Sequence, residues 1–223
     1  MKKISLLFLS GFLAFASYSQ VTFGLRVSPA LSINRVKDLN SADGYILSNN
    51  GSGVRFAFGP TLDFHLGENY RFSTGAWYLS SRAGLSATTT GGFVYTEVVS
   101  LQSMQIPITF KAYTNEIATN MKLYFQLGGL ATFNFYEKFK ESAPITPSSY
   151  DNKYSIFDFS LYLGAGVSYK IGESNALFAG VYYSRGLVNM FDGSTISSTN
   201  QTKWKDLAKY NNDLVGLEVG VTF

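Results

Sequence analysis

The feature that most constrains this chain is an alternation of apolar and polar residues that recurs from residue 21 onward. Its clearest instance is the C-terminal segment, where glycine, glutamate and threonine separate Val215, Leu217, Val219, Val221 and Phe223. Because successive Cβ atoms of a β-strand point to opposite faces, such a segment has one apolar and one polar face. The alternation therefore predicts a protein built from two-faced β-strands.

About eight segments carry this pattern, and the links between them alternate in length. The predicted strands cover residues 22–33, 54–65, 70–82, 103–111, 122–135, 156–170, 176–187 and 215–223. Short links fall near 66–70, 114–121 and 171–175, and long polar links fall near 34–52, 83–93, 136–155 and 188–212. This order predicts antiparallel neighbours with every long link at the same end of the sheet.

Two features depart from the regular pattern. In the third predicted strand, Trp77 and Leu79 share the parity of Arg71 instead of lying on a separate apolar face. Pro60 and Pro107 also fall inside predicted strands, where proline lacks the N–H group that a sheet ladder uses. We expect local bulges at both prolines.

Composition indicates which environment the apolar faces meet. Charged residues make up 15% of the chain, well below the roughly 25% usual in soluble domains. The polar faces are diluted by glycine, serine and threonine, which is too weakly polar for the solvated exterior of a soluble barrel of lipocalin or streptavidin type. In lipid the sheet must close, because no water satisfies an open strand edge. The predicted fold class is an all-β, eight-stranded antiparallel up-and-down transmembrane β-barrel.

The N-terminal residues resemble a signal peptide. Two lysines precede an uncharged, largely apolar stretch over residues 4–16, and small Ser17 and Ser19 fit a cleavage site before Gln20. Cleavage after Ala16 and an uncleaved membrane anchor remain alternatives. We therefore expect a signal peptide over residues 1–19, a barrel domain over 20–223, and export to the outer membrane. Without the two lysines of this segment, the chain has 16 basic and 15 acidic residues. So small a positive surplus gives no reason to expect a nucleic-acid partner.

The chain resembles the PorT-like outer-membrane β-barrel family of Bacteroidetes, with a barrel of OmpA/OmpX type. The resemblance rests on the N-terminal signal, on segments 23–27 and 104–108, on Lys111 with Tyr113, and on the C-terminal segment 220–223. It implies the fold and the outer-membrane location. A final strand that ends in Phe223 is similar to the assembly signal that barrel-assembly machinery recognises. The resemblance implies little about activity, since only PorT itself is tied to secretion.

Charged residues of the inward parity form the main candidate site. They are Arg26, Arg55, Asp63, Lys111, Asp158, Lys170 and Glu218. One interpretation is a polar conduction path, and the other is a set of mutually paired charges that fills a closed lumen. The interior of an eight-stranded barrel is just wide enough for side chains, and an unpaired buried charge is costly, so we expect a paired network.

Other chemistry has weaker support. His65 is the single histidine and has no serine within three residues, so the base and nucleophile of a lipid A-modifying barrel enzyme are not indicated. With no cysteine and no phosphate-loop, zinc-protease or calcium-loop motif, we expect no catalytic site, cofactor or metal. Lys203, Trp204 and Lys205 in the last long link are candidates for contact with lipopolysaccharide phosphates or a protein.

These observations predict a non-enzymatic outer-membrane barrel with four extracellular loops and a structural or surface-interaction role. The expected partners are outer-membrane lipids and lipopolysaccharide, barrel-assembly machinery during biogenesis, and an envelope protein. The alternatives are an accessory membrane component of protein secretion, by resemblance to PorT, a small pore, and a lipid A-modifying enzyme.

Overall fold

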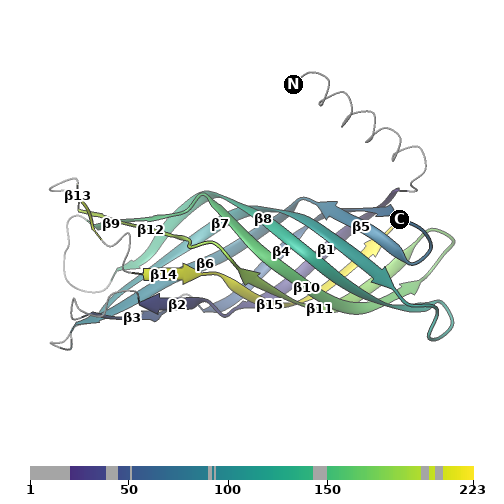
Figure 1. Ribbon diagram of the computed structural model, residues 1–223, viewed down its shortest axis with the longest axis horizontal. Coiled ribbons are helices and arrows are strands. Elements are labelled where there is room, and N and C mark those ends of the chain that lie inside the picture. Colours follow the sequence, from purple (N-terminus) through teal and green to yellow (C-terminus); the bar gives the residue numbers. More distant parts are fainter. Residues whose placement is uncertain are drawn as a thin grey trace, which may run out of the picture.

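The computed structural model describes residues 21–38, 45–50, 52–89, 92, 94–142, 150–196, 201–203 and 208–223. The predicted signal peptide lies outside these residues. Within them the secondary structure is β-strand, and no helix is long and apolar enough to cross a membrane. The strands form an elongated barrel, and the short additional strands β2, β3, β9, β12, β13 and β14 gather at one end of it (Figure 1).

The described residues form a closed antiparallel barrel with eight wall positions, as the alternation predicts. In ring order, these are β1 (Val21–Ser32), β4 (Gly53–His65), β5 (Tyr70–Gly75) with β6 (Trp77–Thr89), β7 (Val94–Tyr113), β8 (Met121–Ser142), β10 (Phe157–Lys170), β11 (Ala176–Gly186) and β15 (Asp213–Thr222). The ring closes where β1 pairs with β15, from Gly24 opposite Thr222 to Ser32 opposite Leu214. Closure leaves no free edge in the spanning part of the sheet, which is the condition that lipid imposes.

The prediction of bulges at Pro60 and Pro107 is wrong. The pairings of β4 with β1 and of β7 with β8 continue without a shift through both prolines. The irregularity falls instead on the strand between them, where β5 and β6 are separated by the single residue Ala76. The pairing of β5 and β6 with β7 keeps one register across this break. A proline on either side removes ladder donors from the same stretch, and the intervening strand loses its regular pairing there.

The long links contain more β-structure than the sequence pattern indicated. β6 and β8 extend into the predicted loops 83–93 and 136–155, and β7 begins at Val94, nine residues before the predicted strand 103–111. Short strands also occupy the links 34–52, 136–155 and 188–212: β2 (Arg35–Asp38), β3 (Tyr45–Asn49), β9 (Tyr150–Tyr154), β12 (Phe191–Ile196), β13 (Gln201–Lys203) and β14 (Ala208–Asn211). These segments extend beyond the apolar band, so their outward side chains no longer meet lipid. They therefore keep hydrogen-bonded pairing without the apolar alternation that marks a membrane strand.

The alternating faces point in the expected directions. On β10, Phe159, Leu161 and Leu163 are 37–46% exposed on the outer surface, whereas Ser160 and Tyr162 are at most 3% exposed inside. Large exposed apolar side chains cover the wall in the same way on β1, β4, β7, β8, β11 and β15. Burial of polar side chains inside and exposure of apolar ones outside is the arrangement of a barrel surrounded by lipid.

Candidate functional site

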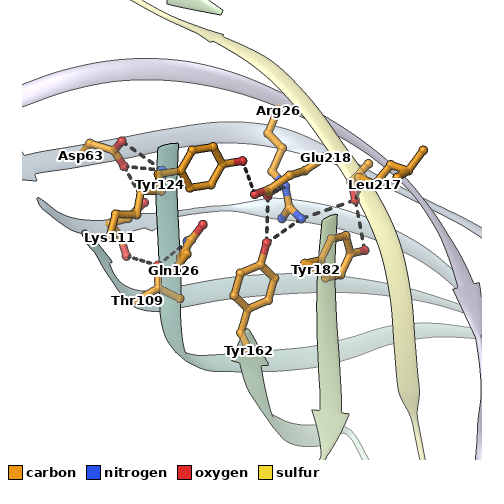
Figure 2. A network of polar contacts seen from close by, with 12 residues as sticks. Arg26, Asp63, Thr109, Lys111, Tyr124, Gln126, Tyr162, Tyr182, Leu217 and Glu218 are labelled. Atoms are coloured by element: carbon orange, nitrogen blue, oxygen red, sulfur yellow. Dashed lines mark hydrogen bonds and ion pairs between the residues drawn. The ribbon is translucent and has the colours of Figure 1, made fainter. Parts of the chain in front are cut away.

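An ion pair between the first and last barrel strands lies at the centre of the lumen. Arg26 Nε on β1 is 2.9 Å from Glu218 Oε2 on β15, and both side chains are at most 3% exposed. Tyr124 donates a 2.7 Å hydrogen bond to Glu218 Oε1, and Tyr162 donates a 2.8 Å bond to Oε2. These tyrosines come from β8 and β10, so the carboxylate of Glu218 connects β15 to two strands that are not its neighbours in the sheet (Figure 2).

Aromatic rings enclose the guanidinium of Arg26. Its Cζ atom lies 3.9 Å from the ring centroid of Trp77 and 4.8 Å from that of Tyr182. Tyr162 and Tyr182 stack on each other, with centroids 5.2 Å apart. The cation is therefore stabilised by a carboxylate and by ring faces in a site with little water, where such contacts are stronger than at a surface.

A second ion pair lies nearer the short turns. Lys111 Nζ on β7 is 3.0 Å from both carboxylate oxygens of Asp63 on β4. Ser73 on the intervening β5 donates a 2.5 Å hydrogen bond to the same carboxylate. Arg71, whose guanidinium lies 4.4 Å from the Tyr113 ring centroid, contributes a longer contact of 3.9 Å to Asp63. The Asp63–Lys111 pair joins β4 to β7 across the intervening β5 (Figure 2).

The loop end of the lumen holds a small apolar core. Its buried members are Ala83, Val99, Leu101, Met190 and Tyr210, with Val36 packed against them. Met190 belongs to the segment after β11, and its amide donates a hydrogen bond to the Tyr210 carbonyl. The Tyr210 hydroxyl accepts a hydrogen bond from Asn34, and burial raises its pKa. Side chains from the last long link thus cover the lumen with apolar contacts.

The remaining predicted lumen residues behave differently from these pairs. Arg55 is buried near the loop end, where its guanidinium donates to the Arg82 carbonyl. Asp158 is 2% exposed, and its Oδ1 atom has no hydrogen-bond partner among the described atoms. The prediction that Lys170 belongs to the lumen network is wrong, because its side chain is exposed at the turn end of β10. The strand continues past the enclosed lumen there, so inward parity no longer leads to burial.

The other candidate residues lie away from the lumen clusters. His65 is the last residue of β4, where it pairs across the sheet with Arg71. The Phe223 ring is exposed at the turn end, and its amide donates to the Phe23 carbonyl. Lys203 ends β13, while Trp204 and Lys205 fall outside the described residues.

Sequence reasoning underestimated the inward aromatic residues. Tyr124 and Tyr162 have the inward parity, but a period-two pattern does not show that their hydroxyls meet on one carboxylate. Glycines on the polar faces were the available signal. A Cβ at Gly216 would lie 2.5 Å from the Tyr182 ring, and one at Gly166 would lie 2.5 Å from the Tyr124 hydroxyl. Each glycine leaves room for an inward tyrosine on a nearby strand.

Comparison with known protein families supports the same architecture. Residues 15–192 match the family described as "Outer membrane protein beta-barrel domain", which is well over half of the 223 residues. The chain belongs to this outer-membrane β-barrel family. Its location in the outer membrane, predicted from the lipid-facing pattern, is thereby confirmed. The match does not distinguish the PorT-like group, which remains a prediction.

Solved structures resemble the family fold seen here. The outer membrane protein OprG from Pseudomonas aeruginosa is 13% identical, with a TM-score of 0.54 over 92% of this chain and 97% of that one. The outer membrane protease OmpT from Escherichia coli is 11% identical, with a TM-score of 0.51 over 92% and 96%. At these identities the likeness shows the fold alone. A comparison with curated protein sequences gave no match.

Proposed function

We propose that this protein is a non-conducting, non-catalytic outer-membrane barrel whose extracellular end carries a surface-interaction role. The observation that carries the proposal is the bridging of the lumen by Glu218, which contacts β1, β8 and β10 from its place on β15. A pore needs a continuous polar path, and here the polar groups are bonded to one another across that path.

The arrangement of charges supports a structural role for the lumen. Arg26 and Lys111 each have a carboxylate within 3.0 Å, so neither cation is available to attract a permeating anion. Beyond these pairs, the apolar core around Met190 and Tyr210 covers the loop end. Ions would meet an apolar layer and then neutralised pairs, and both raise the cost of removing water from the ion.

The absence of catalysis is inferred from how the two ion-paired lumen carboxylates are used. Glu218 accepts two phenol hydrogen bonds, and Asp63 accepts bonds from Lys111 and Ser73. A general base needs a carboxylate or imidazole within reach of a substrate proton. These carboxylates instead stabilise buried cations, which leaves the strand extensions at the loop end as the part available for recognition.

Single-channel recording in planar bilayers tests the proposal. We expect no discrete conductance from the folded protein. A variant with Tyr124, Tyr162 and Tyr182 all replaced by alanine serves as a positive control, because it empties the central lumen while keeping the wall. Folding of each preparation is checked by the heat-dependent mobility shift in SDS gels. Reproducible conductance steps from the unmodified barrel would contradict a closed lumen.

The surface role is tested by crosslinking and affinity capture of the tagged protein from native outer membranes. We expect envelope components that contact the loop-end strands. Deleting residues 197–200, which connect β12 to β13 in the sequence, should reduce their recovery if that end makes the contact. Recovery of secretion machinery that is insensitive to this deletion would favour the accessory, PorT-like alternative.

A further inference from the structure

An open hollow of about 600 Å³ lies in the outer wall at the loop end. It is lined by residues 34–37 of β2 and its approach, by Ser48 and Asn49 of β3, and by Lys209 and Asn211 of β14. β2 and β14 continue the pairing of β1 and β15 in the same register, from Arg35 opposite Asn211 to Asp38 opposite Ala208. The hollow therefore belongs to the barrel wall itself.

The hollow lies where the described wall is incompletely paired. β2 pairs with β14, and β3 pairs with β6, but no ladder joins β2 to β3 among the described residues. Facing strand edges that are not joined present backbone N–H and C=O groups to whatever lies between them. A ligand in this hollow would meet backbone donors as well as side chains.

Positive charge collects around this hollow. Lys37 and Lys209 are exposed and lie directly opposite each other on β2 and β14, an arrangement of like charges that destabilises a sheet unless an anion neutralises it. Among the described side chains, neither lysine has a carboxylate within ion-pair distance. Arg35 lies on the same face and pairs with Asp213 through Nε at 2.5 Å, which raises the pKa of Arg35. Arg185 on β11 is exposed on the other side of Asp213.

We call Arg35, Lys37, Arg185 and Lys209 the rim cations. Their height relative to the membrane narrows the choice of ligand. On the same outward face, Leu31 and Ile33 are 55% and 54% exposed and belong to the apolar band. Arg35 lies two residues after Ile33, and Lys37 lies four residues after it. These separations correspond to about 7 and 13 Å along a strand. The rim cations therefore begin where lipid headgroups replace acyl chains.

A tyrosine marks the same boundary on the neighbouring strand. The Tyr183 ring on β11 is 37% exposed toward the apolar band, and its hydroxyl donates a 3.1 Å hydrogen bond to Asp213 Oδ2. Tyrosine with an apolar ring and a hydrogen-bonded hydroxyl is typical of the membrane interface. The ligand that fits this position is an anion attached to the membrane.

We propose that the rim cations and the hollow bind the phosphorylated headgroup of an outer-leaflet glycolipid, of the lipid A type. Phosphate oxygens accept charge-assisted hydrogen bonds from lysine and arginine, and one phosphate neutralises the facing Lys37 and Lys209. The acyl chains of the same lipid lie against Leu31, Ile33 and the neighbouring outer wall. This inference rests on the proposed surface role, to which it assigns a partner.

Native mass spectrometry of the full folded protein in nonionic detergent tests the site, with bisphosphorylated lipid A as the probe. We expect a saturable lipid adduct that Lys37→Gln/Lys209→Gln weakens by about 30-fold, since each lysine near an anionic surface contributes about 1 kcal/mol. Arg35 is left intact because it holds Asp213. The matched control, Lys122→Gln/Lys170→Gln, removes two lysines at the turn end and should bind as the unmodified protein does.

Three results would overturn the lipid site. They are equal binding of lipid A stripped of its phosphates, unchanged affinity in Lys37→Gln/Lys209→Gln, and displacement of the lipid by inorganic phosphate at matching concentration. The last would indicate a site for a free anion. Bilayer conductance measured on the same preparations separates the two proposals, because conductance refutes the closed lumen alone and these binding results refute the lipid site alone.

Discussion

Replacing Glu218 with leucine tests how far the lumen depends on its central ion pair. The change leaves the guanidinium of Arg26, 3% exposed, without a counter-charge. Breaking a buried pair by removing one partner costs about 3–5 kcal/mol. Tyr124 and Tyr162 also lose their acceptor, which adds about 1–3 kcal/mol for each hydroxyl that finds no new one. We therefore expect Glu218→Leu to lower the free energy of unfolding by at least 3 kcal/mol, on the order of the broken pair alone.

Replacing the arginine of the same ion pair should lower the free energy of unfolding by less. Arg26→Met leaves Glu218 buried but still hydrogen-bonded to both phenols, at 2.7 and 2.8 Å. The double variant removes both charges, and such replacements are often close to neutral. We expect the double variant to be more stable than the sum of the single effects predicts, by about 2 kcal/mol or more.

Urea unfolding in detergent micelles measures these effects. The fluorescence of Trp77 is the reporter, in a Trp204→Phe background, because Trp77 is 2% exposed and lies over Arg26. Glu173→Gln in an exposed turn is the matched control and should change the free energy of unfolding by less than about 0.5 kcal/mol. Strict additivity of the single variants, or a Glu218→Leu effect no larger than that of the control, would refute the reasoning.

Two further predictions concern the packing of each face. Gly216→Ala should lower the free energy of unfolding by about 1–3 kcal/mol, because its Cβ would lie 2.5 Å from the Tyr182 ring, whereas Gly172→Ala in an open turn should have no such effect in the same assay. Leu163→Arg, at the middle of the outward row of β10, should cost about 2–4 kcal/mol in a lipid bilayer, and Tyr169→Arg near its turn end only about 0–1 kcal/mol. Equal costs at the two outward positions would count against a lipid-facing wall.

The barrel wall can be predicted from the sequence because successive side chains of each wall strand alternate between the outer and the inner face. We call this alternation the two-residue rule. Phe159 and Leu161 point outward, and the parity of each alone predicts that. Even the irregular third strand follows the rule, because the inward parity of Trp77 and Leu79 leads them into the lumen, where they are buried. The alternation looked irregular there because the inner face of that strand is partly apolar.

Parity does not determine which inward groups meet. Arg26 and Glu218 are far apart in the sequence and become neighbours only through ring closure, so their ion pair follows from topology. Lys170 has the same parity but lies beyond the enclosed lumen, which no local pattern reveals. The lysine pair of Lys37 and Lys209 was missed for a related reason, since the strands that hold it lie in predicted loops.

The central claim is that the apolar face meets acyl chains while the inward aromatic residues are shielded from them. Two single-tryptophan proteins test it in bilayers containing brominated acyl chains. One keeps Trp77 with Trp204→Phe, and the other carries Leu163→Trp with Trp77→Phe and Trp204→Phe. Strong quenching of the probe at position 163, with weak quenching of Trp77, is the predicted result. Stronger quenching of Trp77 than of the probe at position 163 would contradict the account.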